Sequence, residues 1–212
     1  MKTHGGGNDG GVAGAVVEFR TSRPEIFDFL LQEGFQVSFV DRCTIREFLC
    51  CQLALCGDYT EKNIQTIFLN SRPVDDVDAA VLRGDDRLAL SAAMPGLVGA
   101  TMRKRGFFAK MRHSISHDSA GGDDRAAGRG KRCLIQVKLF NLLARDLARD
   151  FLARGIFFPV ERLCTLLGRR PVRFFADLNA VSVNGEPLDS PKEMEDRLRP
   201  LSGCVQLRLL GD

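Results

Sequence analysis

Cysteine is the residue type of this sequence with the most obvious chemistry. The chain has 7 cysteines, and four of them gather between residues 43 and 56. A structural zinc site needs thiolates at a spacing such as Cys-x-x-Cys, which does not occur here. The adjacent pair Cys50 and Cys51 would point about 100° apart on a helix. We therefore interpret the cysteines as reduced, structural thiols that behave as small apolar side chains.

Histidine and aspartate provide two further candidates. His113 and His117 are four residues apart, a spacing that places both imidazoles on one helical face and could hold a metal ion. Their surroundings are polar and rich in glycine, which favours a solvated linker. The aspartates at positions 75, 76 and 78 lack the alternating ligands of a calcium loop and are typical of a turn. The sequence thus predicts no catalytic residue, no metal and no cofactor.

A basic and aromatic segment is the strongest candidate for binding. This composition can meet nucleic-acid phosphates and bases, an anionic membrane surface or an acidic groove on a protein. The alternative is a tethering helix that packs its aromatic rings on its own domain and leaves its charges in water. The predicted binding residues are Arg103, Lys104, Arg105, Phe107, Phe108, Lys110 and Arg112.

Composition limits the class of protein. The chain has 212 residues, 44% of them apolar, which is ordinary for a protein with a buried core. A formal net charge of +3 is too small to indicate nucleic acid as a partner of the whole molecule. The first 14 residues do not resemble a signal peptide, and the longest uncharged run, residues 88 to 102, is short of the roughly 20 residues of a membrane span. We expect a cytoplasmic protein without a membrane span.

The chain divides where its composition is least typical of folded structure. The sequence predicts a flexible glycine-rich tail over residues 1–14, a folded block over 15–100, a basic flexible linker over 101–132 and a second folded block over 133–212. Each block is expected to fold by itself.

The two blocks repeat one pattern. The order Asn, two residues, Pro, aliphatic residue, Asp occurs at 70–75 and again at 184–189. A helix is expected before each hairpin, beginning at a capping box of Thr44 and Glu47 in the first block and at Pro159 in the second. Alternating apolar residues predict an opening strand, a weaker second strand and a closing strand in each block. The predicted strands cover 16–19, 35–39, 64–75 and 87–90, then 135–140, 153–158, 178–189 and 204–209.

This order resembles the ubiquitin-like β-grasp fold, and most closely its sulfur-carrier branch, which includes the small subunit of molybdopterin synthase and the sulfur carrier of thiamine synthesis. Residues 135–140 look like the first strand of such a carrier, 181–188 like its third strand and hairpin, and 83–90 like its last turn and strand. The resemblance implies an α+β fold of two β-grasp units, each a mixed sheet with one main helix packed across it.

The resemblance to the carriers stops at the end of the chain. Sulfur carriers end in Gly-Gly, because a tail without side chains must enter a partner enzyme, whereas this sequence ends in Leu-Leu-Gly-Asp. We therefore expect a non-catalytic interaction or adaptor protein whose partner is another protein, bound through the basic segment and the exposed sheet faces. The alternatives are a divergent sulfur-carrier-like protein of molybdopterin or thiamine biosynthesis, and a nucleic-acid binder that uses the basic segment.

Overall fold

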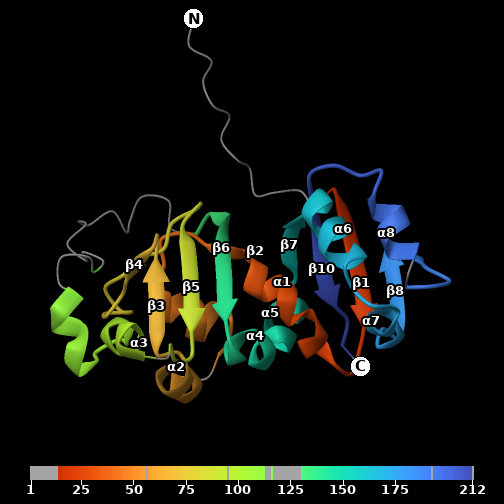
Figure 1. Cartoon of the computed structure of the whole chain (residues 1–212). Coiled ribbons are helices and arrows are strands. Elements are labelled where there is room, and N and C mark those ends of the chain that lie inside the picture. The colour runs from red at the N-terminus through yellow and green to blue at the C-terminus, as the bar shows by residue number, and fades with distance from the viewer. Residues whose placement is uncertain are drawn as a thin grey trace, which may run out of the picture.

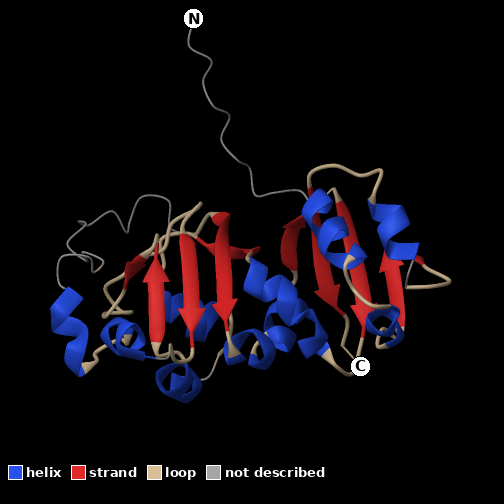
Figure 2. Ribbon diagram, in the orientation of Figure 1, coloured by secondary structure: helices blue, strands red, loops and turns tan. Residues whose placement is uncertain are grey.

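One mixed sheet of ten strands runs through the protein in the computed structural model, with helices packed against it (Figures 1 and 2). The structure describes residues 14–55, 57–94, 96–112, 116, 130–191 and 193–211. The strand order is β4-β3-β5-β6-β2-β7-β10-β1-β8-β9. The strands are β1 (Ala15–Arg20), β2 (Phe35–Val40), β3 (Thr66–Leu69), β4 (Arg72–Pro73), β5 (Arg87–Ser91), β6 (Arg132–Phe140), β7 (Ile156–Pro159), β8 (Ala180–Val183), β9 (Glu186–Pro187) and β10 (Cys204–Leu209).

Short helices join the strands, and the mixture of helices and a mixed sheet agrees with the predicted α+β class. The helices that precede β6 in the sequence are η1 (Pro24–Phe27), α1 (Asp28–Glu33), η2 (Glu47–Gln52), α2 (Gly57–Asn63), α3 (Gly96–Met102) and η3 (Phe107–Arg112). Those of the second part are α4 (Leu142–Asp146), α5 (Ala148–Arg154), α6 (Val160–Gly168), α7 (Val172–Ala176) and α8 (Glu193–Leu198).

The first strand of each block lies in the sheet of the other block. β1 pairs in parallel with β10 and antiparallel with β8, both from the second block. β6 pairs antiparallel with β2 and in parallel with β5, both from the first block. We call β4-β3-β5-β6-β2 the N-terminal half and β7-β10-β1-β8-β9 the C-terminal half. The predicted blocks 15–100 and 133–212 follow the repeat in the sequence. Strand pairing instead groups β6 with the strands of the first block and β1 with the strands of the second block.

The same pairing pattern occurs in both halves. Asn70 Oδ1 accepts a hydrogen bond from the backbone N of Arg87 in β5 at 3.0 Å, and Asn184 Oδ1 accepts one from the backbone N of Val16 in β1 at 2.8 Å. β1 thus has the place in the C-terminal half that β5 has in the N-terminal half, and β10 corresponds to β6. The halves join where β2 pairs antiparallel with β7, at Gln36 and Phe157.

A core of apolar side chains follows the predicted alternation along the strands. Phe35, Val37 and Phe39 of β2 are almost completely buried, while the residues between them are partly exposed. Phe39 meets Phe48 of η2 edge to face, with 6.0 Å between the ring centroids. The predicted capping box is confirmed: the backbone N of Thr44 donates to Glu47 Oε2 at 2.8 Å, and the backbone N of Glu47 donates to Thr44 Oγ1 at 3.1 Å.

Two helical connections that the sequence analysis did not predict carry the chain from one half to the other. η1 and α1 lead from β1 to β2, and α4 and α5 lead from β6 to β7. α1 packs against β6, and α5 packs against β10. These connections lie along the lower centre of the molecule in Figure 1. They are needed because the first and second strands of each block lie in different halves.

The predicted linker is partly helical. Residues 101–112 belong to α3, η3 and the turn between them, while residues 113–115 and 117–129, like residues 1–13 of the predicted tail, lie outside the described residues. Within the described part of the chain, no helix has the length and apolar character needed to cross a membrane.

Candidate functional site: a groove on the open sheet face

The predicted basic segment is divided between internal contacts and exposed side chains. Arg112 is 4% exposed, and its guanidinium donates to Asp75 Oδ1, to the carbonyl of Thr101 and to Ser116 Oγ at 2.7, 2.7 and 2.8 Å. Lys104 Nζ lies 3.4 Å from Glu61 Oε2. These two cations therefore attach the α3–η3 region to the N-terminal half.

Four further members of the segment face outward. Arg103 and Arg105 are exposed, Phe107 is 89% exposed, and the Phe107 and Phe108 rings meet edge to face at 5.2 Å. The structure does not describe the Lys110 side chain. The tethering alternative expected buried rings and solvated charges, but here Arg112 is buried, Lys104 is half-buried and both rings are exposed.

The other candidates have structural surroundings. Asp76 Oδ1 accepts hydrogen bonds from the backbone N of Asp78 and of Ala79, as a turn requires, and the Arg46 guanidinium lowers the pKa of Asp78. Burial raises the pKa of the Cys43 thiol to about 11. No group of three metal-ligating side chains occurs within the residues that the structure describes. The candidate histidines and Cys56 lie outside them.

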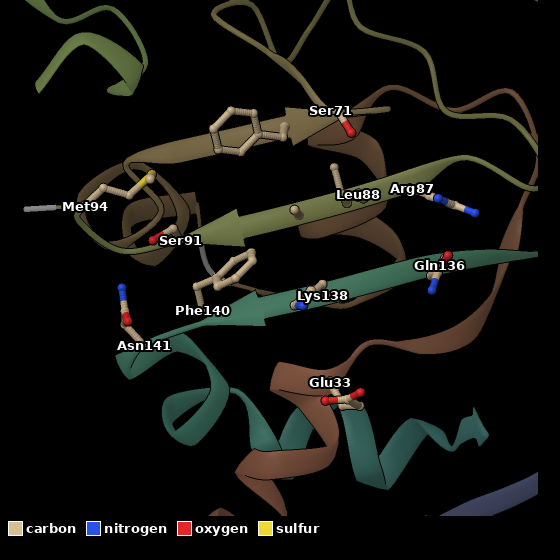
Figure 3. A pocket seen from close by; sticks show the side chains of 12 residues that line it. Glu33, Ser71, Arg87, Leu88, Ser91, Met94, Gln136, Lys138, Phe140 and Asn141 are labelled. Atoms are coloured by element: carbon tan, nitrogen blue, oxygen red, sulfur yellow. The ribbon is translucent and has the colours of Figure 1, made fainter. Parts of the chain in front are cut away.

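A groove of about 580 Å³ lies on the face of the N-terminal half that points away from η2 (Figure 3). Its floor consists of outward-facing residues of β3, β5 and β6, because alternate residues of these strands point to the core. Phe68, Ala89 and Phe140 provide apolar surface from the three strands, and Met94 adds more at one end. The volume falls in the range of sites that hold small ligands or the side chains of a partner.

The charges around the groove do not balance. Lys138 and Arg87 line it, and no carboxylate of the described residues lies within ion-pair distance of either. Lys138 Nζ lies over the Phe140 ring, 5.3 Å from its centroid. Glu33 is the acidic residue of the lining, and its carboxylate pairs with Arg162. The groove therefore combines apolar surface with uncompensated positive charge.

One end of the groove contains buried hydroxyl groups with unused hydrogen-bonding capacity. Ser91 lines the groove near Met94 and Asn141, is 2% exposed, and its Oγ has no partner among the described residues (Figure 3). Thr66 is paired with Ser91 across β3 and β5, and its Oγ1 is buried and also without a partner there. A buried hydroxyl without a hydrogen bond costs about 1–3 kcal/mol. Such a group needs an explanation, and a bound water or another molecule would supply the missing hydrogen bond.

The corresponding surface of the C-terminal half is built differently. Phe68 faces Ala89 across β3 and β5, and the equivalent pair across β8 and β1 is Ser182 and Glu18. Lys138 is replaced there by Arg208, which is aligned with Glu18 in the parallel pair of β1 and β10. The two surfaces share backbone pairing but not side chains. An apolar floor with an unmatched cation thus occurs in the N-terminal half and not at the equivalent positions of the C-terminal half.

Sequence reasoning missed this groove, although a signal for it was present. Phe68 and Phe140 are aromatic residues at outward positions of alternating strands, where polar residues are usual. Comparison with known proteins adds no assignment, since no family model, no curated protein and no solved structure matches the chain.

Proposed function

We propose that this chain is a non-catalytic binding protein, and that the groove on its N-terminal half receives apolar side chains of a partner protein. The observation that carries the proposal is the difference between the two halves. Backbone pairing is the same in both, so folding alone does not require Phe68 and Ala89 where the other half has Ser182 and Glu18. An apolar patch placed on one of two equivalent surfaces is typical of an interaction site.

The strand arrangement also supports a relationship of each half to the β-grasp fold. In each half a parallel central pair, β6 with β5 or β10 with β1, is flanked by antiparallel strands and a short hairpin. A scaffold of this kind would offer an exposed sheet face to a partner, but fold alone does not give function. The proposal therefore depends on the groove and not on the scaffold.

The test uses a matched pair of substitutions at equivalent positions of the halves. Phe68→Arg places a long cation in the groove, and Ser182→Arg places the same side chain on the corresponding strand of the C-terminal half. Each purified variant and the unchanged chain would be used to capture partners from native lysate, with quantitative mass spectrometry of the retained proteins. Thermal unfolding of both variants would verify that they fold.

We expect Phe68→Arg to lose at least one protein that the unchanged chain and Ser182→Arg both retain. Retention of the same proteins by all three would place binding outside the groove and refute the proposal. Loss in Ser182→Arg alone would move the contact surface to the C-terminal half.

A further inference from the structure

We infer that the partner segment held by the groove carries an acidic side chain next to an apolar one. This inference rests on the proposed function and specifies the chemistry of the partner. It follows from the way in which charge, apolar surface and hydrogen-bonding groups are combined within one groove.

The charge of the groove selects an anion. Lys138 and Arg87 contribute two positive charges, and neither has an ion-pair partner among the described residues. The one carboxylate of the lining, Glu33, is already paired with Arg162 at the edge of the groove. An occupant with a carboxylate would balance this charge, whereas a cationic occupant would add to it.

Apolar surface lies directly beside this charge. The Lys138 ammonium is 5.3 Å from the centroid of the Phe140 ring, so the cation and the apolar floor meet within the length of one dipeptide. Phe68 and Ala89 extend the apolar surface across β3 and β5. An apolar side chain on this floor would leave an adjacent acidic side chain near Lys138.

The buried hydroxyl at the end of the groove adds a third requirement. Ser91 Oγ is buried and has no partner among the residues described, and the Met94 side chain lines the same end (Figure 3). The backbone N–H and C=O groups of a peptide occupant would complete the hydrogen bonding of this hydroxyl once the Met94 side chain moves aside. The groove therefore fits a peptide segment better than a purely apolar surface.

A pair of model peptides isolates the effect of charge. N-acetyl-Asp-Phe-amide and N-acetyl-Asn-Phe-amide have the same size and the same aromatic side chain and differ in the carboxylate. Each would be titrated into the full chain while the backbone amide resonances of β3, β5 and β6 are followed by NMR. The variants are Lys138→Gln and its counterpart in the other half, Arg208→Gln.

We expect both peptides to shift resonances of the groove, with the Asp peptide binding about threefold more tightly at low salt, because a partly exposed ion pair contributes modestly. Lys138→Gln should remove most of this preference, and Arg208→Gln should leave it unchanged. Raising the ionic strength should also reduce it.

The outcomes separate the two levels of the proposal. Equal binding of the two peptides, or a preference that persists in Lys138→Gln, would refute the acidic partner and leave an apolar groove. Absence of any shift in β3, β5 and β6 with either peptide would count against the groove as a binding site and thus against the proposed function itself.

Discussion

Replacement of Phe19 by alanine should weaken the C-terminal half of the sheet, although Phe19 belongs to the first block of the sequence. Phe19 is 1% exposed, and its ring centroid lies 4.5 Å from that of Phe27. It stands in β1 between β8 and β10. Removal of a fully buried phenylalanine side chain typically costs about 3–5 kcal/mol, which is a large part of the stability of a small protein.

The matched control is Leu90→Ala, because Leu90 has the same place in β5 that Phe19 has in β1 and is also buried. Its expected cost is about 2–5 kcal/mol. Urea denaturation would give both changes in free energy, and hydrogen exchange followed by mass spectrometry would locate them. Phe19→Ala should first expose amides of 180–183 and 204–209, and Leu90→Ala those of 66–69 and 132–140.

The opposite distribution would refute the strand exchange. If Phe19→Ala opened β2, β3 and β5 while β8 and β10 stayed protected, β1 would belong with the strands that follow it in the sequence. A fragment of residues 15–100 would not contain β6, which is the strand that joins β2 to β5.

Further predictions concern the segment 101–112, a buried thiol and the groove. Arg112→Ala should destabilise the protein by about 1–3 kcal/mol in urea denaturation, because it removes the hydrogen bonds of a buried guanidinium to Asp75, Thr101 and Ser116. Exposed Arg103→Ala should change stability by less than about 0.5 kcal/mol, and equal effects of the two changes would contradict the internal role of Arg112. Burial raises the pKa of the Cys43 thiol in the folded chain to about 11, whereas an unfolded thiol has a pKa of about 8.5. Between these values the unfolded chain loses the proton first, so the free energy of unfolding should fall by an amount on the order of 2 kcal/mol as the pH rises from about 9 to 11. Cys43→Ala should lack this component, and an equally steep fall in that variant would exclude Cys43 as its source. Phe68→Arg should lose a captured protein that Ser182→Arg retains, and Lys138→Gln should lose its preference for the Asp peptide.

Local features of the fold could be predicted because neighbouring residues in the sequence determine them. The capping box of Thr44 and Glu47 and the repeated hairpins at Asn70 and Asn184 are short-range patterns, and each occurs where the sequence places it. The exchange of β1 and β6 could not be predicted in this way. Alternation in a strand indicates which face is buried, but it does not identify the neighbouring strand.

The candidate site was harder to predict for a related reason. Lys104 and Arg112 have the composition of a solvated basic segment, and their partners Glu61 and Asp75 lie far away in the sequence. Phe68 and Phe140 become one surface only when β3 and β6 are placed on the two sides of β5. The sequence contained the residues of the groove but not their proximity.

The pairing of β1 with β8 and β10 has a consequence for the synthesis of this protein. β1 is synthesised before β2 to β7, whereas the strands on both its sides, β8 and β10, are synthesised after them. Until β8 and β10 have been made, β1 has neither of its neighbouring strands, and its apolar residues are covered only in part, as by the contact of Phe19 with Phe27. β1 is therefore made before β2 to β7 but takes its place in the sheet after them, and folding of the C-terminal half waits until β8 and β10 have been synthesised.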